Sequence, residues 1–151
     1  MKARMDLVTI FGIAFGYLEA MVVVYLRRIL PPLPWEVMSV AEFSNLLRSH
    51  GVLFLEQTRE ASTIVILIAI ALLIGKKRSE KWAIFLWAFA IWDIFYYIWL
   101  KVLIGWPPSL VTIDCLFLIP GPRFAPVFVP LVVSLVMMGV AIFLLRKAKK
   151  S

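Results

Sequence analysis

Three acidic residues, Glu19, Glu60 and Asp93, lie inside long apolar stretches of this sequence. If these stretches cross a bilayer, a charged side chain near the centre costs at least about 2.5–3.5 kcal/mol. Such residues are kept where they pair with another group, carry protons or bind a cation. We therefore take Glu19, Glu60 and Asp93 as candidate coupling or binding carboxylates.

A single base accompanies these acids. Arg59 lies beside Glu60 and three residues after Glu56, so it can neutralise one carboxylate within its own helix. In one interpretation, Arg59 pairs with Asp93 or Glu19, and the polar groups only specify which helices pack together. In the other interpretation, Arg59 tunes a binding site, because the acids outnumber it.

The elements that must position these groups follow from composition. The chain has 151 residues, of which 63% are hydrophobic, and a mean hydropathy of +0.96. Soluble domains are roughly 45–50% apolar, so this composition indicates a membrane protein. Four segments have the roughly 20 apolar residues that a spanning helix needs, at about 7–26, 52–75, 82–104 and 126–145. We predict an all-α, integral membrane four-helix bundle that forms one transmembrane domain over residues 1–151.

Depth within the bilayer can be counted at about 1.5 Å per residue from the flank of each span. The count places Glu19 about 20 Å, Asp93 about 18 Å and Glu60 about 24 Å deep in a hydrocarbon core of about 30 Å. Tyr96 and Tyr97 fall in the same layer and could form its hydrogen-bonding wall. The three acids come from three different spans, so we expect them to converge.

A second set of charged residues is predicted at the rim above this layer, where it could also contact lipid headgroups. Its members lie near the predicted outer ends of the spans or in the segment 105–125: Arg27, Arg28, Glu56, Lys101, Asp114 and Arg123.

The basic residues indicate orientation. The two termini and the loop between the second and third spans hold ten of the 16 basic residues and two of the nine acids. That side has a net charge of +8 and the rest of the chain −1. The positive-inside rule then places both termini in the cytoplasm. The positive net charge therefore predicts contact with anionic headgroups on the cytoplasmic side, and not nucleic-acid binding.

Two segments are predicted on the outer side, at about 31–51 and 105–125. In the first, Val37, Val40, Phe43 and Leu47 recur at helical spacing, which predicts a short amphipathic helix on the surface. The second is rich in proline and too short to span, so we expect a re-entrant or interfacial half-helix. Within the first span, Gly12, Gly16 and Ala20 form a small-residue row that allows close helix packing.

No sequence motif indicates a cofactor or a metal. One cysteine and one histidine cannot build a thiolate zinc site, a redox pair or the Glu-x-x-His pattern of di-iron bundles. Phosphate-binding glycine loops and hydrolase motifs are also absent from the sequence. We predict no cofactor.

The strings EQTREAST, WDIFYYIWLKVLIGWPPSL and TIDCLFLIPGPRFAPV carry a resemblance over most of the chain. They are similar to a group of uncharacterised prokaryotic four-span membrane proteins. The resemblance implies only that the quoted acids and aromatic residues are distinctive, and it implies no activity. Separately, we expect an integral protein of a prokaryotic plasma (inner) membrane.

Three functions are compatible with the sequence. The first is transport of protons, cations or a small cationic solute, in a homo-oligomer, because four short spans enclose little volume. The second is a membrane enzyme that acts on a lipid or polyprenyl headgroup at the outer leaflet, with Arg27, Arg28, Lys101 and Arg123 holding a phosphate. The third is a non-catalytic accessory or assembly subunit of a membrane complex.

Overall fold

The computed structural model describes residues 2–30 and 39–150. Four long helices carry the fold: α1 (Lys2–Ile29), α3 (Leu53–Ile74), α4 (Arg78–Ile104) and α5 (Phe128–Lys150). Each is long and apolar enough to cross a membrane. A long helix lies at each of the four predicted positions, and its bounds agree with the predicted ones to within five residues at each end.

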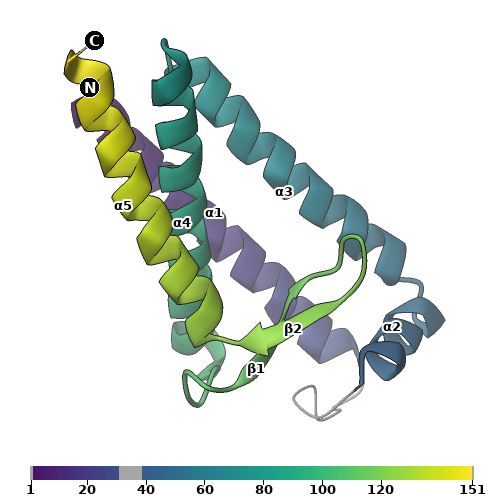
Figure 1. Cartoon of the computed structure of the whole chain (residues 1–151). Coiled ribbons are helices and arrows are strands. Elements are labelled where there is room, and N and C mark those ends of the chain that lie inside the picture. The colour runs from purple at the N-terminus through teal and green to yellow at the C-terminus, as the bar shows by residue number, and fades with distance from the viewer. Residues whose placement is uncertain (1, 31–38, 151) are drawn as a thin grey trace.

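Two short elements complete the fold at one end of the long helices. They are α2 (Val40–Ser49) and an antiparallel hairpin of β1 (Ile113–Phe117) and β2 (Arg123–Pro126). Figure 1 shows the hairpin lying across this end, between α5 and the region of α2 and α3. Both termini and the loop between α3 and α4 lie at the opposite end.

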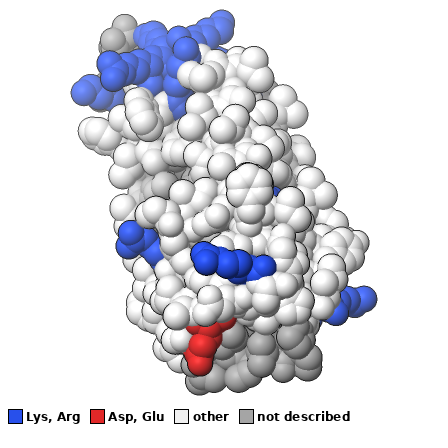
Figure 2. All heavy atoms as spheres, turned by 90° about the vertical axis from the view of Figure 1, so that its right-hand side faces the viewer, with Lys and Arg blue, Asp and Glu red and all other residues white. Residues whose placement is uncertain are grey.

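Charge separates along the same axis. Figure 2 shows Lys and Arg side chains crowded at the end that holds the termini, followed by a broad band that is almost entirely uncharged. The described basic side chains of that end come from three segments: Arg4, Lys76, Lys77, Arg78, Lys81, Arg146 and Lys147. An uncharged band between charged ends fits the hydrocarbon layer of a bilayer.

Helix α4 is the central element, since it contacts α1, α3 and α5. Its closest approach to α1 is at the predicted small-residue row. A Cβ atom on Gly16 would lie 2.8 Å from the backbone oxygen of Trp92, and one on Gly12 would lie 2.8 Å from a methyl carbon of Ile91. Two backbones can approach this closely only where one side chain is absent.

The hairpin corrects two expectations. The segment 105–125 does not form a half-helix, and the chain is mostly helical but not all-α. The reason is the prolines at 120, 122 and 126, which lack the N–H that a helix requires. Helix α4 ends at Gly105, whose φ of 70° is the left-handed conformation that terminates helices. The strands pair in the register Ile113 with Pro126 and Asp114 with Ala125.

Helix α2 occupies the second half of the segment predicted to hold an amphipathic helix. A capping box begins it, in which the backbone N–H of Ser39 donates to the Glu42 carboxylate (2.8 Å) and the Ser39 hydroxyl accepts from the Glu42 N–H (3.3 Å). Phe43 and Leu47 are buried, and they pack with Leu118 of the hairpin. Val40 is exposed, and Val37 lies outside the described residues.

Candidate functional site

A cavity of about 310 Å³ lies where all these elements meet. Side chains of α1, α2, α3, α4, α5 and the hairpin line it, and most of them are aliphatic or aromatic. This size and character are typical of small-molecule sites. The lining includes five carboxylic acids and two arginines: Glu19, Glu56, Glu60, Asp93, Asp114, Arg27 and Arg59.

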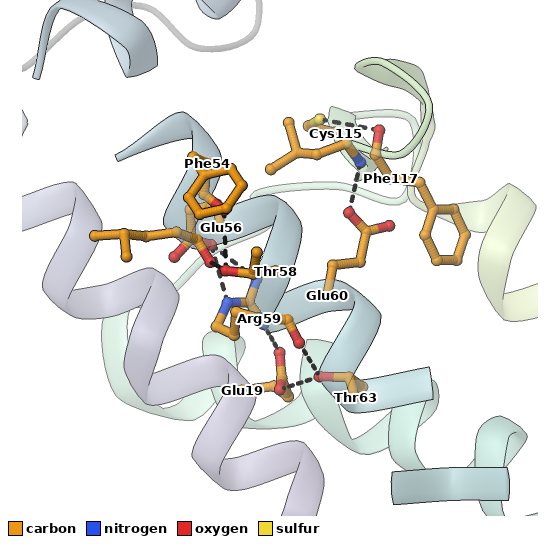
Figure 3. A network of polar contacts seen from close by, with 11 residues as sticks. Glu19, Phe54, Glu56, Thr58, Arg59, Glu60, Thr63, Cys115 and Phe117 are labelled. Carbon is orange, nitrogen blue, oxygen red and sulfur yellow. Dashed lines mark hydrogen bonds and ion pairs between the residues drawn. The ribbon is translucent and has the colours of Figure 1, made fainter. Parts of the chain in front are cut away.

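Arg59 joins two of the acids, as Figure 3 shows. Its guanidinium group lies 2.8 Å from the Glu56 carboxylate and also forms an ion pair with Glu19 of α1. The Thr63 hydroxyl donates to the second Glu19 oxygen at 2.7 Å. One of the two predicted partners of Arg59, Glu19, is therefore its partner in the structure, and the pair connects α1 with α3.

Glu60 attaches the hairpin to α3. Its carboxylate accepts a hydrogen bond of 2.8 Å from the backbone N–H of Leu118 (Figure 3). One helical turn earlier, the Gln57 amide donates to the carbonyl oxygen of the same residue at 3.2 Å. Both backbone groups of Leu118 are thus satisfied by α3, which holds the connection between β1 and β2 beside the cavity.

Asp93 and Asp114 accept hydrogen bonds from hydroxyl groups. The Ser134 hydroxyl of α5 donates to Asp93 of α4 at 2.8 Å, and the Tyr97 hydroxyl of α4 donates to Asp114 of β1 at 2.9 Å. Burial raises the pKa of Asp114 to about 6, although the Tyr97 hydrogen bond acts in the opposite direction. These two contacts connect α4 to its neighbours on the far side of the cavity from Arg59.

The structure therefore brings all six predicted coupling or binding residues to one cavity: Glu19, Arg59, Glu60, Asp93, Tyr96 and Tyr97. Among the described residues, both ion pairs are made by Arg59. The hydrogen-bond donors to Glu60 and Asp93 are an uncharged N–H and an uncharged hydroxyl. If every lining group is ionised, the carboxylates outnumber the guanidinium groups by three. Such a negative excess in an apolar cavity must be offset by protons or by a bound cation.

The predicted rim residues are divided. Glu56, Asp114 and Arg27 line the cavity, and the Arg27 guanidinium lies 4.2 Å from the ring centre of Trp106.

The other three predicted rim residues, Arg28, Lys101 and Arg123, are exposed and do not line the cavity. Lys101 instead donates to the carbonyl oxygens of Gly105 (3.1 Å) and Pro107 (2.8 Å), which caps the end of α4. Counting residues gives the depth of a side chain, but the face it occupies depends on helix rotation.

Several lining residues were not predicted. Ser134 is the one hydroxyl-bearing residue in the stretch 128–148 of α5. A single polar residue in an otherwise apolar helix could have indicated from the sequence that it faces the interior. Thr63 lies one turn after Arg59, also on the inner face of α3. Trp92 lines the cavity too, and its indole N–H is buried with no hydrogen-bond partner among the described residues. Nothing in the sequence indicates that last feature.

The site is not built like a metal centre. Within residues 2–30 and 39–150, no group of three or more His, Cys, Asp or Glu side chains could hold a metal ion. Cys115 lines the cavity, but burial raises the pKa of its thiol to about 12, so the thiol is protonated at neutral pH. His50 is exposed at the end of α2, with Nδ1 2.9 Å from the carbonyl oxygen of Leu46.

Comparison with family models, with curated proteins and with solved structures found no match for this chain. The arrangement itself defines a class: four apolar helices that fit an integral membrane protein, with a mostly apolar cavity that contains several charged side chains near the end of the bundle away from the termini.

Proposed function

We propose that this chain binds a small cationic solute in the cavity and moves it across the membrane. The observation that carries the proposal is the environment of Glu60 and Asp93. Both carboxylates line a cavity of about 310 Å³, and both receive their hydrogen bonds from uncharged donors. A cation that enters the cavity would neutralise them, and in its absence protons can do so, which would couple solute movement to protons.

An organic cation fits this lining better than a bare metal ion. Metal binding needs several ligand atoms close together, and the described acids form no such group. The lining instead combines separate carboxylates with aromatic rings, among them Trp92, Tyr96 and Phe117. Aromatic faces attract ammonium groups within about 6 Å of the ring centre. Carboxylates and aromatic rings together are the chemistry that recognises an alkylammonium ion.

The alternative, an enzyme that acts on a phosphate-bearing headgroup, has less support. It requires several basic residues around one phosphate. Of the four proposed for this role, only Arg27 lines the cavity. No observation specifically favours the accessory-subunit alternative.

The proposal includes an orientation in a prokaryotic plasma membrane. The basic end of the molecule, which holds both termini, would face the cytoplasm and its anionic headgroups. The cavity would then lie in the outer half of the bilayer. About half of the residues of α3 and of α5 are exposed in a single chain, which is consistent with a homo-oligomer.

Uptake of radiolabelled tetramethylammonium into proteoliposomes tests this function, because a permanent cation of this kind crosses lipid poorly on its own. We expect uptake by the wild type and at least a tenfold loss in Glu60→Gln and in Asp93→Asn. Asp6→Asn is the matched control, since it removes one exposed carboxylate outside the cavity. Uptake no greater than in empty liposomes, or equal in all four proteins, would contradict the proposal.

A further inference from the structure

The exposed residue in the lining of the cavity marks where the cavity meets the surface of the bundle. Among the described residues that line it, Val133 of α5 is the exposed one, with half of its surface (50%) accessible. Val133 lies five residues after the first residue of α5, or about 7.5 Å along the helix axis. It is therefore inside the apolar span Phe128–Ala148. An opening at this level faces the hydrocarbon of the bilayer, and not water.

Asp93 is connected to this position through Ser134. The Ser134 hydroxyl donates to the Asp93 carboxylate, and Ser134, the residue next to Val133, is only 1% exposed. A group that enters past Val133 can therefore reach the Asp93 carboxylate. Glu60 and Ile64 of α3 also line the cavity.

The end of the cavity that points away from the termini is covered. The hairpin lies across that end of the helices (Figure 1) and lines the cavity, held to α3 through Glu60 and Leu118 and to α4 through Tyr97 and Asp114. The contact of α2 with the hairpin adds to this cover, since the rings of Phe43 and Phe124 pack edge to face at 5.5 Å. Entry past Val133 requires none of these contacts to break.

We propose that the natural ligand is an amphiphilic cation, a single-chain lipid with an ammonium head. The head lies between Asp93 and Glu60, and the apolar chain leaves past Val133 between α3 and α5 into the bilayer. The cavity of about 310 Å³ takes the head and the start of the chain, while the surrounding lipid takes the rest. Charge complementarity selects a cationic head, and the lateral opening selects a molecule that is already dissolved in the bilayer. This proposal rests on the proposed function, because it uses the same carboxylates.

Two ligands with the same head separate this proposal from the proposed function. Isothermal titration of the purified protein in dodecyl maltoside compares dodecyltrimethylammonium with tetramethylammonium. Dodecyl maltoside carries an uncharged head on a chain of the same length and is present in excess. Tighter binding of dodecyltrimethylammonium than of tetramethylammonium therefore requires both the chain and the charged head. We expect the long-chain cation to bind at least tenfold more tightly than tetramethylammonium, and Asp93→Asn to remove that binding.

A matched pair of variants tests the opening itself. Val133→Trp would fill it and should weaken binding of dodecyltrimethylammonium at least tenfold more than it weakens binding of tetramethylammonium. Val136→Trp makes the same substitution at another exposed position of α5 that does not line the cavity, and it should change neither affinity.

The outcomes are distinguishable. Equal affinity for the two cations, with both lost in Asp93→Asn, would overturn the amphiphile proposal and leave the proposed function standing. Binding that is insensitive to Asp93→Asn would refute both. An equal loss of affinity for the two cations in Val133→Trp would contradict the assignment of Val133 to the opening. The comparison of the two cations on the wild type remains decisive if Val133→Trp does not fold.

Discussion

Gly16 is the position where a single methyl group should most clearly disturb the fold. A Cβ atom there would lie 2.8 Å from the backbone oxygen of Trp92, 3.0 Å from the backbone nitrogen of Tyr96 and 3.2 Å from the carbonyl carbon of Phe95. Ordinary contact begins near 3.4 Å, so α1 and α4 must separate by about 0.6 Å. All three atoms belong to the α4 backbone and cannot rotate away. Overpacking of this kind costs about 1–3 kcal/mol.

Gly139→Ala is the matched control for Gly16→Ala. A Cβ atom on Gly139 of α5 meets nothing within 4 Å. Glycine to alanine increases intrinsic helix stability by about 1 kcal/mol at either position. The difference in the free energy of unfolding between the two variants therefore isolates the packing cost. Gly12→Ala should fall between them, because its nearest contact at 2.8 Å is a side-chain methyl of Ile91 that can move.

The free energy of unfolding can be measured by titrating dodecyl sulfate into mixed micelles and following helix content by circular dichroism. We expect Gly16→Ala to be about 1–3 kcal/mol less stable than Gly139→Ala. Equal stability of the two variants would refute the close packing of α1 on α4, and with it the position of Glu19 against α3.

Three further predictions concern the ion pairs, the hairpin and the orientation. Arg59→Met leaves Glu19 and Glu56 without a cation and should cost about 2–3 kcal/mol in the same titration. That is below the ~3–5 kcal/mol of a fully buried pair, because the Arg59 side chain is 28% exposed. Adding Glu19→Gln and Glu56→Gln to Arg59→Met should recover most of the lost stability. If these two substitutions recover none of it, the pairing is contradicted. Because burial raises the pKa of Asp114 from 3.8 to about 6, its ionisation destabilises the fold. Wild type should therefore lose thermal stability relative to Asp114→Asn as the pH rises from about 4 to about 6, with a constant difference above that range; a flat difference would argue against this burial. Alkaline phosphatase fused after His50 should be active and a fusion at the C-terminus inactive, and the reverse pattern would contradict cytoplasmic termini.

The spans could be predicted from sequence because a bilayer imposes one length and one polarity on every crossing helix. The shared depth of Glu19 and Glu60 followed from the same geometry. The sequence offered two partners for Arg59, Glu19 and Asp93. It did not decide between them, because the residue count places both acids at nearly the same depth. The small-residue row at Gly12 and Gly16 indicated close packing, but it did not identify α4 as the partner.

Other features depended on contacts that sequence patterns do not encode. The hairpin was missed because a proline-rich segment excludes a continuous helix without specifying what replaces it. Its position over the cavity depends on hydrogen bonds from Gln57 and Glu60 to the backbone of Leu118, a residue far away in sequence. The Asp93 to Ser134 contact required the pairing of α4 with α5.

Direct binding of tetramethylammonium to the purified protein, measured by isothermal titration calorimetry, tests the central claim that the cavity carboxylates bind a cation. Wild type and Asp6→Asn should bind with equal affinity, and the double variant Glu60→Gln/Asp93→Asn should bind at least tenfold more weakly. Equal affinity in all three proteins, with the double variant folded by circular dichroism, would contradict the claim.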